Sequence, residues 1–114
     1  EDVLPSIAND EFKENKLSDN YKILYTFDVN SKEDINQQIN DLRIYIEEID
    51  YLDLRVSEDF YNNIITFVVI HGLKSYDGSL GLSERLEKTI SIQAESFYMI
   101  SSDNYKTVQI HKNL

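Results

Sequence analysis

The chain has 114 residues, a formal net charge of −10 and no cysteine. Its length is typical of a single domain, and its content of aliphatic and aromatic residues is sufficient for a hydrophobic core. The excess of acidic residues argues against binding to nucleic acid or directly to an anionic membrane, because both carry phosphates that basic side chains must neutralise. The lack of cysteine excludes a disulfide framework, a thiolate metal site and a cysteine nucleophile.

Residues 1–20 are predicted to form a flexible acidic leader or stalk that precedes one α+β domain at residues 21–114. The leader contains Pro5, the only proline, and six acidic residues against two lysines. This composition favours disorder or a loosely docked arm. The chain begins with Glu1 instead of methionine, as a protein does after loss of a signal peptide or membrane anchor, or after truncation. The location stays open, and we favour an extracytoplasmic one, secreted or membrane-anchored, over the cytoplasm.

The first part of the domain predicts a strand followed by a helix. Tyr21–Val29 places aromatic and β-branched residues at alternate positions, which is typical of a strand. Ser31 follows as a capping residue, and the apolar positions then recur at steps of four and three, as on one face of a helix. These positions are Ile35, Ile39, Leu42, Ile46 and Ile49.

Two more strands and a loop are predicted next. Leu52–Ser57 alternates apolar and polar residues, which indicates a half-exposed strand, and Glu58–Asn63 supplies turn residues. Ile64–His71 is apolar on both faces and is predicted to be a central strand. Gly72–Gly81 contains all three glycines and is predicted to be a mobile loop.

The segment Ser83–Ile100 is open to two interpretations. As a helix it places five apolar residues on one face, with Ser83 as the cap. As strands it divides into Thr89–Gln93 and Phe97–Ile100, with Ser101–Asn104 as a hairpin turn. We favour the helix because the apolar positions fit its period. In both interpretations Tyr105–His111 alternates and is predicted to be an edge strand.

The resulting order is strand, helix, strand, strand, helix, strand. Two right-handed crossovers that share one sheet give the ferredoxin-like, or split βαβ, arrangement, with a four-stranded antiparallel sheet and two helices on one face. In that fold the first and third strands are central. Tyr21–Val29 and Ile64–His71 are accordingly the strands richest in aromatic and aliphatic residues.

Residue patterns for catalysis and for metal binding are missing from the sequence. The glycines are not followed by the lysine and hydroxyl residue of a phosphate-binding loop. The candidates for a catalytic base are His71 and His111, at the ends of strands predicted to flank the first strand on opposite sides. Their imidazoles would then lie about 10 Å apart, too far to share a metal ion directly. The acidic stretch from Glu47 to Asp59 lacks the glycine of a calcium loop. We expect no catalytic residue, no metal and no cofactor.

The acidic residues are concentrated in the first half of the chain. Residues 61–114 hold five acidic and five basic residues, so the whole net charge lies in residues 1–60. An acidic surface can steer a basic partner, and tyrosines in predicted turns are typical of interfaces. The candidate partner surface consists of Glu47, Glu48, Asp50, Asp53, Tyr61 and Tyr76.

These observations predict a non-catalytic protein-interaction domain, the soluble portion of an exported or membrane-anchored bacterial protein of the assembly or secretion type. A partner or a second copy would pair with an edge strand such as Leu52–Ser57. Two alternatives stay open. One is an acidic inhibitor or immunity protein that binds a basic partner, and the other is a small-molecule sensing module.

Overall fold

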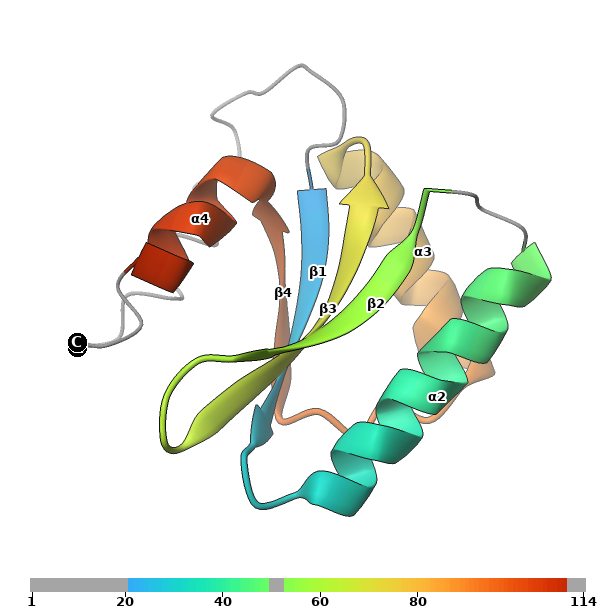
Figure 1. Cartoon of the computed structure of the whole chain (residues 1–114). Coiled ribbons are helices and arrows are strands. Elements are labelled where there is room, and N and C mark those ends of the chain that lie inside the picture. Colours follow the sequence, from blue (N-terminus) through green and yellow to red (C-terminus); the bar gives the residue numbers. More distant parts are fainter. Residues whose placement is uncertain (1–20, 50–52, 111–114) are drawn as a thin grey trace.

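The computed structural model describes residues 21–49 and 53–110, and this part of the chain forms one sheet with helices on both faces (Figure 1). The strands are antiparallel and lie in the order β2-β3-β1-β4. The predicted α+β, ferredoxin-like arrangement is therefore confirmed, with the first and third strands at the centre. The predicted leader at residues 1–20 lies outside the described residues. In chain order the elements are β1 (Tyr21–Asp28), α2 (Lys32–Ile49), β2 (Arg55–Phe60), β3 (Ile65–Leu73), α3 (Tyr76–Thr89), β4 (Ser96–Ser101) and α4 (Ser102–Ile110).

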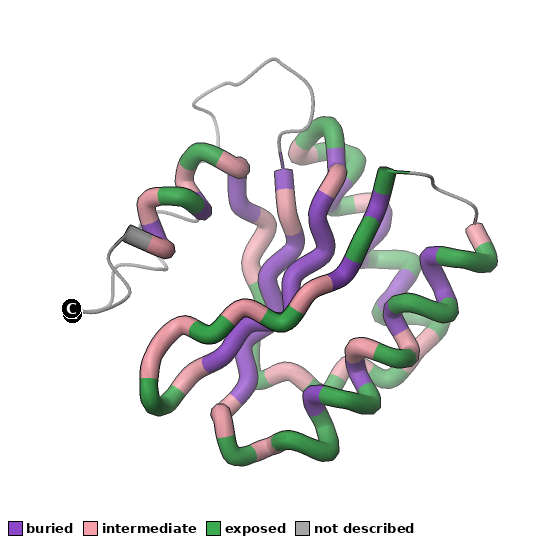
Figure 2. Tube along the Cα trace, in the orientation of Figure 1, coloured by how far each residue is buried: buried purple, intermediate pink, exposed green. Residues whose placement is uncertain are grey.

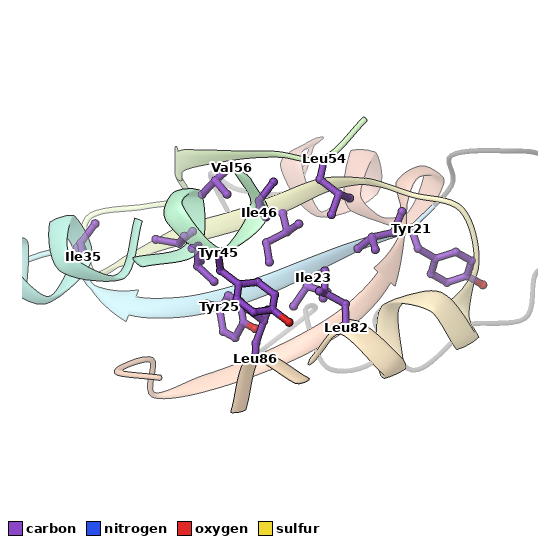
Figure 3. Packing of buried hydrophobic residues seen from close by; sticks show 14 of the residues in the cluster. Tyr21, Ile23, Tyr25, Ile35, Tyr45, Ile46, Leu54, Val56, Leu82 and Leu86 are labelled. Atoms are coloured by element: carbon purple, nitrogen blue, oxygen red, sulfur yellow. The ribbon is translucent and has the colours of Figure 1, made fainter. Parts of the chain in front are cut away.

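The sheet has a hydrophobic cluster on each face. The larger cluster lies between the sheet and the helices α2 and α3, where residues such as Ile23, Tyr25 and Leu86 meet (Figure 3). The smaller cluster lies on the opposite face, where Tyr105 and Val108 of α4 pack with residues of β1, β3 and β4. Figure 2 accordingly shows β1 and β3 buried along most of their length. The helix α4 on this second face is an addition to the predicted two-layer arrangement, which had both helices on one face.

The second strand is displaced from the predicted segment. Leu52–Ser57 was the expected strand, but β2 begins at Arg55 and continues to Phe60, through much of the predicted turn. Asn62 is the residue that makes the turn, because its side-chain Oδ1 accepts hydrogen bonds from the backbone N–H groups of Ile64 and Ile65, both at 2.8 Å. Acidic residues are tolerated in β2 because it lies at the edge of the sheet.

The second helix lies earlier in the chain than the prediction. Gly72–Gly81 is not a loop: β3 continues to Leu73, and α3 begins at Tyr76 and contains the other two glycines. Ser75 is the N-cap, and its Oγ accepts a hydrogen bond of 2.9 Å from the N–H of Gly78. Ser83, the predicted cap, lies inside the helix, and α3 ends at Thr89 with Ile90 in extended conformation.

The structure differs from the prediction in its last two elements, β4 and α4. Residues 96–101 form β4, which agrees with the alternative strand interpretation of Phe97–Ile100 and contradicts the favoured helix. Tyr105–His111 was predicted to be a strand, but residues 102–110 form α4. The reason is local: Ser101 Oγ accepts a hydrogen bond of 3.1 Å from the N–H of Asn104, so the expected hairpin turn begins a helix.

A polar side chain, that of Gln38 on α2, lies completely buried in the core. Its Nε2 donates to the carbonyl of Ser91 at 3.0 Å, and its Oε1 accepts from the N–H of Gln93 at 2.6 Å. A buried amide without partners would be destabilising by about 1–3 kcal/mol. These two bonds therefore tie the segment between α3 and β4 to α2.

Gly72 is required by the path of the chain at the end of β3. Its φ is +97°, and a Cβ at this position would lie 2.1 Å from the carbonyl oxygen of Asp53. Gly81, in contrast, lies inside α3, and a Cβ there would meet a side-chain atom of Arg85 at 3.9 Å.

We expect Gly72→Ala to lower the free energy of unfolding by about 1–3 kcal/mol or more, because the substitution adds backbone strain and a contact with backbone. The matched change Gly81→Ala should raise it by about 0.5–1 kcal/mol, because alanine is the better helix former. Urea denaturation of both variants measures the difference, and equal effects would contradict the assigned role of Gly72.

Candidate functional site

The residues of the candidate partner surface do not form one surface. Glu47 and Glu48 are exposed at the end of α2, Asp53 is exposed before β2, and Asp50 lies outside the described residues. The ring of Tyr61 lies 5.0 Å from that of Phe67, on the α4 side of the sheet. The ring of Tyr76, by contrast, lies 6.2 Å from that of Tyr21, on the side of α2 and α3. Partner binding by these residues stays a prediction.

The edge strand β2 is protected against pairing with another chain. It contains charges of both signs, among them the exposed Arg55 and Glu58. The Nη2 of Arg43, on α2, donates a hydrogen bond of 2.9 Å to the carbonyl oxygen of Val56. Edge charges and an occupied backbone acceptor both oppose the addition of a further strand. The expectation that this edge receives a partner is therefore weakened.

The opposite edge strand, β4, has none of these features. Its sequence SFYMIS contains no charged residue and no proline, and within residues 21–49 and 53–110 its neighbour in the sheet is β1 alone. Phe97 is 37% exposed, and Tyr98 and Met99 are half-buried. A neutral apolar edge of this kind is a template for an additional strand.

The ladder of hydrogen bonds indicates which residues of β4 direct their backbone groups outward. The N–H of Val29 donates to Ile64, on the β3 side, whereas the carbonyl of Thr26 accepts from Glu95, on the β4 side. Because the two sides alternate along an antiparallel strand, the residues opposite Thr26 and Leu24, namely Ser96 and Tyr98, bond to β1. Phe97 and Met99 then present their N–H and C=O groups to the outside.

A connected set of polar side chains joins the sheet to α4 on the second face. Tyr105 donates its hydroxyl proton to Asp59 Oδ2 at 2.5 Å, and Ser57 Oγ donates to Asp59 Oδ1 at 2.9 Å. His71 Nε2 lies 2.7 Å from Ser57 Oγ, and Lys22 Nζ lies 3.1 Å from His71 Nδ1. We call these five residues the polar cluster. It connects β1, β2, β3 and α4.

The donors and acceptors of the cluster are consistent with one tautomer of His71. Ser57 gives its proton to Asp59, so it accepts from Nε2–H, and Nδ1 then accepts from the ammonium of Lys22. Burial, followed by the nearby charges of Lys22 and Arg55, lowers the pKa of His71 to about 4. Burial and the hydrogen bond to Asp59 raise the pKa of Tyr105. The cluster therefore holds a neutral imidazole and a neutral phenol at pH 7.

The cluster resembles a serine triad in its residue types but not in its connections. In a triad the histidine accepts the serine proton and donates to the carboxylate. Here Nε2 donates to Ser57, and the other ring nitrogen faces Lys22. This arrangement orients Ser57 toward Asp59 instead of activating it as a nucleophile. What the geometry does is fasten α4 to the sheet.

The cluster was missed in the sequence because its members come from four separate segments. Ser57 and Asp59 share one face of β2, and this signal was lost when the strand was expected to end at Ser57. Tyr105 was placed on a strand instead of a helix. Of the two histidines considered, His71 lies in β3 and is buried, and His111 lies outside the described residues.

Other potential sites are limited. A cavity of about 200 Å³ lies beside the first turn of α3, lined by Leu54, Leu73 and two glycines, and by the exposed ion pair of Asp53 with Lys74 at 3.4 Å. No group of three or more potential metal ligands occurs among residues 21–49 and 53–110. Within the same described segments, no helix is both long and apolar enough to span a membrane.

Comparisons of the chain with protein-family models, with curated proteins and with solved structures find no match.

The pKa of His71 predicts a pH dependence of stability. Between pH 6.5, its ordinary pKa, and about pH 4, the unfolded chain binds a proton that the folded chain does not. Stability should therefore fall as the pH falls through this window, by up to about 3 kcal/mol from this group. His71→Gln should lack this component, as the difference between the two pH profiles of unfolding shows. Parallel profiles, or an NMR titration of His71 near pH 6.5, would contradict the assignment.

Removal of the Tyr105 hydroxyl tests the attachment of α4. We expect Tyr105→Phe to lower the free energy of unfolding by about 1–3 kcal/mol, because Asp59 loses a donor in a partly buried place. Tyr98→Phe is the matched control, since the hydroxyl of Tyr98 has no hydrogen bond to another described residue. Thermal or urea unfolding measures both, and equal losses would argue against the role of Tyr105.

Proposed function

We propose that this chain is a non-catalytic protein-interaction domain that binds an extended segment of protein along the edge of β4. The observation that carries the proposal is the neutral strand Ser96–Ser101, which has one neighbour among the described strands and an exposed Phe97. Strand addition at such an edge gains backbone hydrogen bonds for affinity and side-chain contacts at alternate positions for specificity.

The contrast between the two edges supports this choice. At β2, Arg43 already occupies the carbonyl of Val56, and a new strand would have to displace it. At β4, the faces of the sheet are covered by α3 and α4, while the outward N–H and C=O groups of Phe97 and Met99 lie along the edge. The contact edge expected from the sequence is therefore moved from β2 to β4.

The two alternative functions predict different behaviour. An acidic inhibitor would bind its basic partner mainly through charge, and salt would weaken that complex strongly. Strand addition at an uncharged edge relies on backbone hydrogen bonds and apolar contacts, so salt should have little effect. A sensing module would instead be stabilised thermally by its ligand. The cellular location of the domain stays a prediction.

Proline substitution tests the proposal. Met99→Pro removes an outward N–H and should leave the ladder with β1 intact, whereas Tyr98→Pro removes an inward one and should unfold β4. The wild-type domain is immobilised and exposed to an extract of its source cells. We expect it to retain a protein in 0.5 M salt, and folded Met99→Pro should not retain that protein. Equal retention by both, or release by salt alone, would contradict strand addition at β4.

A further inference from the structure

We infer that the strand received by β4 is the β4 of a second copy of this chain, so that two sheets join into one continuous antiparallel sheet of eight strands. This inference rests on the proposed role of β4 as the contact edge. It commits to one pairing, in which the two strands run antiparallel and the two-fold axis passes between the two Tyr98 residues.

The backbone favours this register. Phe97, Met99 and Ser101 are the residues of β4 whose N–H and C=O groups face outward, and Ser101 is the last residue before α4. When the axis passes at Tyr98, Phe97 of each copy lies opposite Met99 of the other, and the outward groups of these two residues pair. An axis at Met99 would instead need the backbone groups of Ser101, which is followed directly by α4 and whose Oγ accepts from the N–H of Asn104.

The side chains are self-complementary in the same register. Phe97 and Met99 lie on the side of α2 and α3, where a thioether against an aromatic ring is a favourable contact. Tyr98 lies on the side of α4 and would meet its own copy. Each pair is apolar or neutral, so like charges do not oppose each other across the new ladder.

The charge of the chain restricts where a second copy can dock. With a net charge of −10, two copies repel each other over most orientations. An approach along β4 brings together strands without charge, and this strand shows no charge pattern that would select a charged partner. Because Arg43 and the charges of β2 protect the other edge, addition stops at two copies and the assembly is closed.

Because the chain contains no cysteine, a single introduced cysteine can form a protein disulfide only with the same cysteine of a second copy. In the proposed register the two Tyr98 residues form a non-hydrogen-bonded pair, with Cα atoms about 4.5 Å apart, which suits a disulfide. Tyr98→Cys should therefore give a covalent dimer under mild oxidation. Ser96→Cys is the matched control on the same face of the same strand, and its two copies would lie about 14 Å apart. We expect a roughly tenfold excess of covalent dimer from the first variant, because the second distance is too long to bridge.

A reversible measurement complements the crosslink. Sedimentation of the wild-type chain should give twice the monomer mass of 13.4 kDa at high concentration. Tyr98→Lys and Tyr98→Glu should each be monomeric, because like charges would meet at the axis, and an equimolar mixture should restore the dimer.

The outcomes separate this inference from the proposed function. A wild-type chain that stays at 13.4 kDa, with no covalent dimer from Tyr98→Cys, overturns the inference, and the proline pair then decides the proposed function alone. Equal crosslinking of Tyr98→Cys and Ser96→Cys overturns it as well, because the register would be wrong. If a charged variant fails to fold, the two cysteine variants still decide the result.

Discussion

The main constraint on this structure is that an open four-stranded sheet has two edge strands whose outward backbone groups must be paired or protected. Helices cover both faces, but the backbone of a helix packed on a face does not pair with the outward N–H and C=O groups of an edge strand. At β2 the protein uses charges and the Arg43 side chain. At β4 it uses neither. This asymmetry is not required by the fold, since either edge of the sheet can carry charges, and it is therefore the feature that points to an interaction.

β1 is buried on both faces, whereas its neighbour β4 is partly exposed. β1 lies between β3 and β4 and contributes residues to the clusters on both faces, including Ile23 on one and Leu24 on the other. A strand in this position must be apolar at nearly every residue. A strand beside β1 can carry polar side chains only where solvent reaches them. β4 has an apolar residue, Phe97, where solvent does reach it, and a second strand beside it would bury the exposed part of Phe97.

The sequence was sufficient to predict the order of the first six elements and the two central strands, because hydrophobic periodicity reports burial directly, but it misplaced the fourth strand and missed the final helix α4. It was insufficient where side chains decide local structure. Asn62 terminates β2 and Ser75 starts α3, but asparagine and serine also occur at many positions where they do neither. Tyr105 and Val108 are three residues apart on a helix, yet the segment also alternates as a strand would. The favoured helix is wrong for residues 96–100, because these residues form a strand that pairs with β1. The spacing of the apolar residues does not reveal this pairing.

The candidate site was harder to predict than the fold, because it is defined by contacts between residues that are far apart in the sequence. The polar cluster connects such residues and also affects the edge of β4. α4 follows β4 with no residue between them, so the direction of the chain at Ser101 depends on where α4 is fastened. The hydrogen bond from Tyr105 to Asp59 fastens it across the face of the sheet, against Phe67 of β3. α4 is thereby kept over the sheet, and within residues 21–49 and 53–110 no strand pairs with the outer edge of β4 along Phe97 and Met99. A residue pair on α4 and β2 thus helps to set the geometry of the opposite edge of the sheet, three strand positions from β2.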